Sequence, residues 1–154
     1  MGNHPSNREG SLEGIFAGEF THQLDEKGRL AIPAKFRSRF KEGAVVTRWD
    51  PECLALFPRS EWESLNEKIA ERPWTDPAVV RFQRFLVAGA HEAGPDGQGR
   101  IVIPPHLRDW AGLEGEAIVA GVSRNLEVWQ PARWRTHLGD VERTIPETLA
   151  TLGI

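Results

Sequence analysis

The residues best suited to chemistry are two arginines that occupy the same place in two copies of one pattern. Residues 25–33 read DEKGRLAIP, and residues 96–104 read DGQGRIVIP. A guanidinium group is a permanent cation that can donate to a phosphate oxygen or to the edge of a guanine base. Glycine permits positive φ and aspartate bonds to nearby N–H groups, so the pattern predicts a tight turn that leads into a strand. Arg29 and Arg100 are therefore expected at fixed positions beside these turns.

Residue types alone are equally compatible with two interpretations of these arginines. In the first, each aspartate forms only a local salt bridge with its arginine across the turn. Exposed pairs of that kind contribute about 0–1 kcal/mol, which explains the repetition poorly. In the second, Asp25 and Asp96 orient Arg29 and Arg100 toward a nucleic-acid phosphate or a guanine edge.

A basic stretch surrounds the first arginine. Residues 27–41 contain six basic side chains and no acid, namely Lys27, Arg29, Lys35, Arg37, Arg39 and Lys41. The whole chain has a net charge of −3, and its acids gather in residues 61–71 and after Gly139. A run of charges on a helix is usually just solvated. Sorting of the charges along the chain nevertheless predicts a basic face on an acidic body.

Apolar periodicity predicts that each copy is one β-α-β unit. In the first unit we expect a short helix after Pro33, where the missing N–H costs nothing, with Phe36 and Phe40 on its buried face. In the second unit the corresponding helix carries Leu107 and ends at Gly112. The expected strands are residues 16–24, 30–32, 44–47 and 54–57 in the first unit, and 101–103, 117–120 and 126–129 in the second.

Two further helices are predicted between the copies. Ser60 and Glu63 have the spacing of a capping box, which would begin the first of them. Asp76 followed by Pro77 is a start signal for the second.

The repeat predicts an α+β, mainly β fold in which the two copies pair about a pseudo-two-fold axis and close a shared β-barrel. Short helices belong to each half, and a two-helix insert separates them. The predicted division is a mobile N-terminal tail at residues 1–14, repeat 1 at 15–62, the helical insert at 63–88, repeat 2 at 89–134 and a C-terminal segment at 135–154.

Composition excludes several classes of function. Hydrophobic residues make up 40% and charged residues 27% of the 154, and no apolar run is long enough to cross a bilayer. The single cysteine, Cys53, cannot form an internal disulfide, which favours a cytoplasmic protein. The five histidines lack metal-ligand spacing, and no nucleophile or carboxylate pair suggests catalysis. We therefore expect no enzyme activity, metal, cofactor, small-molecule substrate or membrane partner.

Three strings resemble the bacterial MraZ proteins: GEFTH at residues 18–22, LDEKGR at 24–29, and DGQGR at 96–100. The resemblance runs from about residue 15 to residue 139. It implies an AbrB-like swapped-hairpin barrel in which one chain supplies both halves, and ring-shaped homo-oligomers. It also implies a nucleoid-associated transcriptional regulator, a repressor, that binds repeated sites in double-stranded DNA at the promoter of its own division and cell-wall gene cluster.

The resemblance assigns DNA binding to the two Asp-x-x-x-Arg regions. Combined with the basic stretch, it predicts a DNA-binding set of Asp25, Lys27, Gly28, Arg29, Lys35, Arg37, Asp96, Gly99, Arg100 and Arg108. The second copy has Gln98 in place of Lys27 and fewer cations in its helix. The sequence therefore predicts that Arg29 contributes more to DNA binding than Arg100 does.

Three alternatives remain open at this point. The first is an antitoxin-like AbrB relative that binds DNA and also sequesters a protein partner. An enzyme on a related double-psi barrel is the second, although no catalytic constellation supports it. The third is a module that docks other proteins through its arginine loops.

Overall fold

The computed structural model describes residues 14–154, so the predicted N-terminal tail lies outside the described residues except for Gly14. The strands are β1 (Phe16–Gln23), β2 (Arg29–Ala31), β3 (Ala44–Trp49), β4 (Cys53–Pro58), β5 (His91–Glu92), β6 (Arg100–Val102), β7 (Glu116–Ser123) and β8 (Leu126–Trp129). The helices are η2 (Ala34–Phe40), α1 (Arg59–Ala70), α2 (Pro77–Phe82), η3 (Gln83–Val87), α3 (Pro105–Ala111) and α4 (Pro131–Leu152). The chain is thus an α+β protein, as the repeat predicts.

The two copies are joined strand by strand rather than lying side by side. A six-stranded antiparallel sheet has the order β1-β7-β8-β4-β3-β5, and a separate ribbon pairs β2 with β6. Ala55 lies opposite Glu127 in the β4–β8 ladder, and Leu30 lies opposite Ile101 in the ribbon. Each of these pairs joins equivalent residues of the two copies. A pseudo-two-fold axis therefore passes through both ladders.

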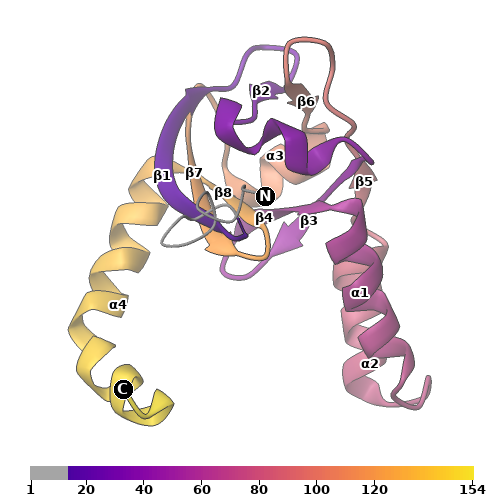
Figure 1. The fold of residues 1–154 in the computed structure, drawn as a ribbon, viewed down its shortest axis with the longest axis vertical. Coiled ribbons are helices and arrows are strands. Elements are labelled where there is room, and N and C mark those ends of the chain that lie inside the picture. The colour runs from indigo at the N-terminus through magenta and orange to yellow at the C-terminus, as the bar shows by residue number, and fades with distance from the viewer. Residues whose placement is uncertain (1–13) are drawn as a thin grey trace, which may run out of the picture.

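The core lies between the ribbon and the large sheet (Figure 1). Strand side chains alternate between two faces, and the inward positions of the ribbon, Leu30 and Ile101, are both almost fully buried. The largest fully buried side chains are Phe16, Ile32, Phe40, Val46, Leu54, Leu56, Ile101, Ile103, Leu107, Val119, Leu126 and Val128. Because both copies contribute to this single core, the ribbon is held rigidly against the sheet.

The short helices pack against strands of the large sheet. The Phe36 ring of η2 packs edge-on against Phe16, with ring centroids 5.1 Å apart. On the other side, the Trp110 indole of α3 donates to the carbonyls of Trp49 and Cys53 at 3.1 and 3.0 Å. The helix predicted after Pro33 is confirmed as a 3-10 helix, and α3 ends at Gly112 in the left-handed conformation, as predicted.

One local prediction about the helices is wrong. The capping box of Ser60 and Glu63 does not form, because α1 begins at Arg59 with Pro58 as its N-cap residue and no side-chain capping bond. Strand β4 runs to Pro58, whose extended ψ leads straight into the helix, so Ser60 is already inside it. The second start signal is confirmed, since the Asp76 side chain accepts a bond from the N–H of Ala78.

Helix α4 was not anticipated, because residues 135–154 were expected only as a C-terminal segment. It is 22 residues long and contains Pro146. Figure 1 shows α4 and the α1–α2 pair as two arms that project from opposite sides of the sheet. This placement follows from the topology. The equivalent strands β4 and β8 are antiparallel neighbours, so the helices that follow them leave at opposite ends of the ladder.

Candidate nucleic-acid interface

The first turn is closed by the side chain of Asp25. Its Oδ1 accepts the backbone N–H groups of Lys27 and Arg29 at 2.9 and 2.8 Å. The carbonyl of Asp25 accepts the N–H of Gly28 at 3.0 Å, and Gly28 has a φ of +81°. Aspartate and glycine thus play the roles that the sequence pattern predicts, with the carboxylate bonding two residues ahead and glycine taking the left-handed position.

The second turn repeats this geometry. Oδ1 of Asp96 accepts the N–H groups of Gln98 and Arg100 at 2.8 and 2.9 Å, and the Asp96 carbonyl accepts the N–H of Gly99 at 2.9 Å. Gly99 has a φ of +75°. The two turns differ at both positions between the aspartate and the glycine, yet they have the same geometry. The shared residues Asp, Gly and Arg therefore determine the turn.

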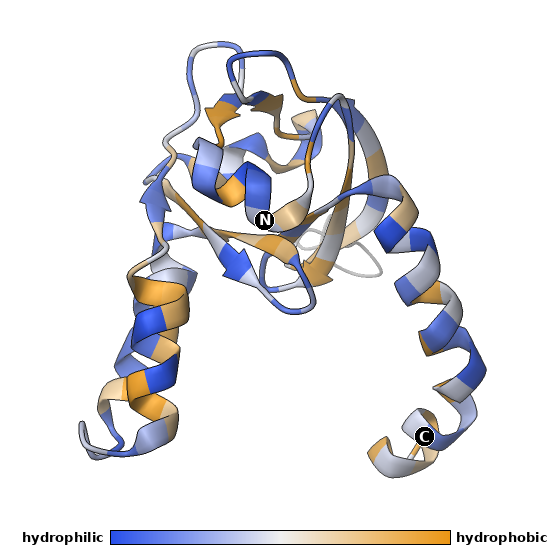
Figure 2. Ribbon diagram, turned by 180° about the vertical axis from the view of Figure 1, so that it is seen from behind, coloured by the Kyte–Doolittle hydropathy of each residue, from blue (hydrophilic) through white to orange (hydrophobic). Residues whose placement is uncertain are grey.

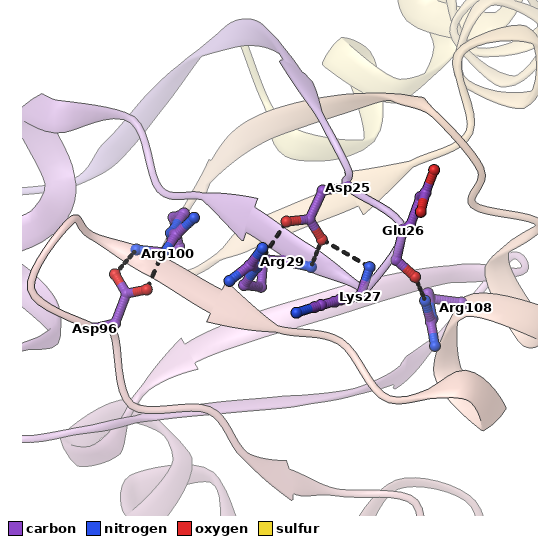
Figure 3. Close-up of polar contacts among 7 residues, drawn as sticks. All are labelled: Asp25, Glu26, Lys27, Arg29, Asp96, Arg100 and Arg108. Atoms are coloured by element: carbon purple, nitrogen blue, oxygen red, sulfur yellow. Dashed lines mark hydrogen bonds and ion pairs between the residues drawn. The ribbon is translucent and has the colours of Figure 1, made fainter.

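Each aspartate also holds its arginine by one edge of the guanidinium group. Nε of Arg29 donates to Oδ2 of Asp25 at 2.6 Å, and Nε of Arg100 donates to Oδ2 of Asp96 at 3.0 Å (Figure 3). A guanidinium group has five N–H donors in a fixed fork. The aspartate takes the Nε donor, and no hydrogen bond from either terminal nitrogen of these arginines is found within residues 14–154. Those nitrogens are the ones that bind guanine or phosphate in a bidentate manner.

Both arginines lie on the same outer face of the ribbon. In the register of β2 with β6, Arg29 is opposite Val102 and Ala31 is opposite Arg100. Leu30 and Ile101 point inward, so these four residues share the outward face. Arg29 and Arg100 are diagonal neighbours there, a relation that separates two residues by roughly 7–8 Å and their Cβ atoms by somewhat less. The ribbon thus presents two oriented cations close together.

Val102 is a member of this face that the sequence analysis missed. Its side chain is 47% exposed although its neighbour Ile101 is fully buried. The alternation of Arg100, Ile101 and Val102 was the available signal, because residues two apart in a strand share a face. Residues 101–103 were predicted only as a strand, with no role for Val102.

The turns are braced across the copies by the arginines of the opposite helices. The Arg108 guanidinium lies beside Gly28, where its Cζ would be 3.1 Å from an added Cβ, and Nη1 donates to the carbonyl of Glu26 at 3.5 Å. Arg37 lies still closer to Gly99, and its Nε donates to the carbonyl of Ile32 at 3.0 Å. Both residues were predicted to bind DNA. Their geometry indicates that they position the turns.

The basic stretch does not gather around the first turn. Lys35 Nζ lies over the Phe20 and Phe36 rings, 5.5 and 5.3 Å from their centroids. Lys41 lines a hollow together with Arg37 and the residues of the second turn. Cations that are neighbours of Arg29 in sequence therefore partly lie beside the second turn in space. Lys27 stays exposed on the first turn itself.

Hydrogen bonding lowers the pKa of both turn carboxylates. For Asp25 the main cause is the backbone N–H of Arg29; partial burial opposes the shift, while the Arg29 side chain and the Lys27 N–H add to it. The pKa of Asp96 is lowered in the same way, first by the backbone N–H of Arg100. A lowered pKa means that the folded turn binds fewer protons than the unfolded chain. The turns are therefore fully stabilised above about pH 4 and lose this contribution as the pH falls through the lowered pKa values.

We expect that Arg29→Ala raises the pKa of Asp25 only part of the way to its ordinary value. The variant removes the guanidinium group, but the backbone N–H groups of residues 27 and 29 still donate to the carboxylate. The measurement is an NMR titration of the aspartate carboxyl carbons, with Asp96 as the internal control that should not change. A complete return of the Asp25 pKa to the ordinary value would show that the ion pair, rather than the turn, holds the charge.

The described residues outside the two turns give no sign of a metal site, a reactive thiol or a membrane-spanning helix. Within residues 14–154 no group of three or more His, Cys, Asp or Glu side chains is arranged to hold a metal ion. Cys53 is fully buried, and burial raises the pKa of its thiol, so it behaves as a small apolar residue. No helix in the same range is both long and apolar enough to cross a membrane.

Comparison with known proteins decides the family. Residues 15–85 and 86–148 each match the family described as "MraZ protein, putative antitoxin-like". The chain belongs to the MraZ family. It is 46% identical over 128 residues to the transcriptional regulator MraZ of Saccharopolyspora erythraea. The aligned segment covers 83% of this chain and 90% of the relative. The MraZ of Thermomicrobium roseum is 45% identical over 141 residues, covering 90% and 99% of the two chains.

A third relative, the transcriptional regulator MraZ of Acetivibrio thermocellus, is 42% identical over 143 residues, covering 91% of this chain and all of the relative. The two matched segments confirm that the chain carries two copies of one domain. Membership also confirms that the protein is not an enzyme, since the family is one of transcriptional regulators. The alternative of a barrel enzyme is thereby removed.

Proposed function

We propose that this protein is a sequence-specific DNA-binding regulator that reads its operator with the outer face of the β2–β6 ribbon. The observation that carries the proposal is the pair of diagonal arginines on the outer face, each held by an aspartate through Nε, which leaves its terminal nitrogens available to a ligand. The major groove of B-DNA admits a two-stranded β-ribbon, and a bidentate arginine on guanine is the commonest specific contact there. Exposed Val102 would then contact a thymine methyl group.

The proposal divides the predicted site residues by role. Arg29 and Arg100 contact bases, and Lys27 contacts phosphate. Asp25, Asp96, Gly28 and Gly99 hold the two turns, while Arg37 and Arg108 brace them from the opposite copy. Lys35, which lies over two aromatic rings, supplies positive charge near the ribbon.

We also propose that the fold is an AbrB-like barrel in which the two copies exchange hairpins. Strands β2, β4 and β1 all pair with strands of the other copy, as expected when two AbrB-like hairpins are swapped into one barrel. One ribbon offers few contacts, so a single site should bind weakly. A ring of identical chains that engages several operator repeats would raise the effective concentration and the overall affinity. We propose such a ring, acting in the cytoplasm as a repressor of its own division and cell-wall gene cluster.

The experiment that tests the function is a footprint on the DNA upstream of the protein's own gene. It should be followed by anisotropy titrations of that DNA and a scrambled duplex at one fixed salt concentration. Protection of regularly spaced repeats, with tighter binding to them than to the scrambled duplex, is the expected result. Equal affinity for both duplexes would mean that the ribbon does not read sequence.

The family description also mentions antitoxin-like proteins, which keeps one alternative in view. In that case the protein would bind DNA and also sequester a protein partner. Purification from its own cells would then yield a stoichiometric complex with a second polypeptide. A product that contains only this chain would favour the regulator without a sequestered partner.

We expect the salt dependence of DNA binding to change with the charge of the third residue in each turn. Lys27 in the first turn corresponds to Gln98 in the second. Each phosphate contact adds about 0.9 to the slope of log K against log salt concentration. Lys27→Gln should therefore make the slope shallower by about one unit, and Gln98→Lys should make it steeper by about one. Lys68→Gln, on α1, is the matched control and should leave the slope unchanged. A slope that responds to neither turn substitution would show that this position lies away from the phosphates.

A further inference from the structure

The β2–β6 ribbon is almost two-fold symmetric in its backbone. The pseudo-two-fold axis passes through the middle of the ribbon, where the central residues of the two strands lie opposite each other. Hydrogen bonds at both ends obey the same symmetry. The N–H of Ile103 donates to the carbonyl of Gly28 at 2.7 Å, and the N–H of Ile32 donates to the carbonyl of Gly99 at 2.8 Å. Because the strands are antiparallel, the axis is perpendicular to the ribbon and passes out through the face that carries the arginines.

This symmetry leaves the direction of DNA binding open. The backbone of B-DNA has local two-fold axes perpendicular to its helix axis, and palindromic operators mirror the two-fold symmetry of the proteins that bind them. A ribbon with an exact two-fold axis would fit one DNA site equally well after a half turn about that axis. Only side chains that differ between the two ends of the ribbon can favour one of these two directions.

The outer face of the ribbon differs between its ends in one pair of residues. One end carries Arg29 with Val102, and the other carries Arg100 with Ala31. The two arginines match in strand position and in their bond to an aspartate (Figure 3). Val102 is 47% exposed, whereas Ala31 is half-buried and shorter by two carbon atoms. Figure 2 shows the hydrophobic positions of the ribbon at the end of the barrel away from the two arms.

The turns add a second difference, because Lys27 of the first turn corresponds to Gln98 of the second. In the proposed function this position contacts phosphate. Phosphates carry no sequence information, so such a contact contributes equally in both directions. An apolar contact with a thymine methyl group depends on the base pair, and it therefore distinguishes one end of a site from the other.

We propose that the pair Val102 and Ala31 determines the direction in which the ribbon lies on its DNA site, with the Val102 end over a thymine. The inference rests on the proposed function, since it takes the ribbon as the surface that reads DNA. Each methylene group removed from water favours binding by a factor of about four. Valine exceeds alanine by two such carbons, so one copy should prefer its direction by roughly four- to sixteen-fold.

The test maps this direction with a DNA-cleaving iron chelate attached to one turn. Cys53 is fully buried, so a thiol reagent should label only a cysteine that is introduced at an exposed position. Glu26→Cys places the label on the first turn, and Gly97→Cys places it at the equivalent, also exposed position of the second. On the duplex upstream of the protein's own gene, the Glu26→Cys label should cut one flank of each protected repeat at least fourfold more than the other. The Gly97→Cys label should cut the opposite flank.

The ribbon variants remove or reverse the difference between the ends. Ala31→Val alone, or Val102→Ala alone, gives both ends the same side chain, so cleavage should spread evenly over both flanks. Ala31→Val combined with Val102→Ala should restore one-sided cleavage, now on the opposite flank. A loss of folding or of affinity could not produce that reversal.

The matched control is Lys27→Gln combined with Gln98→Lys, which exchanges the turn residues and should leave the direction unchanged. The inference would be overturned by equal cleavage of both flanks without any ribbon substitution, by one-sided cleavage that survives Ala31→Val and Val102→Ala, or by a reversal in the control. In each of these cases the protected repeats would leave the proposed function standing. An upstream duplex without protected repeats would contradict the proposed function and, with it, this inference.

Discussion

Arg29→Ala and Arg100→Ala should each lose about 1–3 kcal/mol of discrimination between operator and scrambled DNA, which is the range expected for an arginine that reads a base in bidentate fashion. We expect the two losses to be comparable. Both guanidinium groups are held through Nε by an aspartate, and both stand on the outer face of one ribbon. Neither is required for the core, so circular dichroism and oligomer size should stay unchanged.

This expectation revises the ranking drawn from sequence, which placed Arg29 above Arg100. The ranking assumed that cations near Arg29 in the chain are near it in space. Arg37 instead packs on Gly99 of the second turn, and Lys41 lines the same hollow. The positive charge of the first copy is thus shared with the second turn by the swapped pairing.

The measurement is an anisotropy titration of both variants on operator and scrambled duplexes at one fixed salt concentration. Lys68→Ala, which removes a cation from α1, serves as the control and should change neither affinity. A loss confined to Arg29→Ala would restore the original ranking. Equal weakening on both duplexes would mean that the arginines bind phosphate only.

The turns were predictable from sequence because their constraints are local. Aspartate bonds to N–H groups two and four residues ahead, and glycine supplies the positive φ, so a pattern of five residues determines the geometry. The repeat also predicted the pseudo-symmetry. The bracing of each turn by the other copy's helix could not be predicted, because residues about 60 to 80 positions apart meet only after the strands pair.

Helix α4 was missed for a physical reason. Pro146 lacks an N–H and usually ends a helix, and Gly139 weakens helix formation, so residues 135–154 lacked a clear pattern. Its start signal was nevertheless present. Pro131 occupies the first turn, and the Gln130 side chain accepts the N–H of Arg133 at 2.8 Å. The large apolar residues of its second half, Val141, Ile145, Leu149 and Leu152, are exposed, so no core contact indicated the helix.

A large stability effect is expected at the glycine of the first turn. A Cβ at Gly28 would lie 2.5 Å from the carbonyl oxygen of Ile103, and the N–H of Ile103 donates to the Gly28 carbonyl at 2.7 Å. The backbone cannot move away without breaking that bond. Positive φ costs a residue with a Cβ about 1–2 kcal/mol and overpacking adds about 1–3. Gly28→Ala should therefore lower the free energy of unfolding by about 2–5 kcal/mol.

Gly99→Ala separates the two contributions, because its φ of +75° is equally restrictive but the obstructing atoms belong to the Arg37 side chain. A side chain can swing aside, so this variant should lose only about 1–2 kcal/mol. Adding Arg37→Ala should remove the remaining clash without restoring the strained φ. Gly97→Ala is the matched control in the same turn, since no atom lies within 4 Å of its added Cβ and its φ is not restrictive. Urea unfolding at one fixed protein concentration measures all four variants. Equal losses at Gly28 and Gly99 would show that φ alone determines the cost and that contact with the opposite copy contributes nothing.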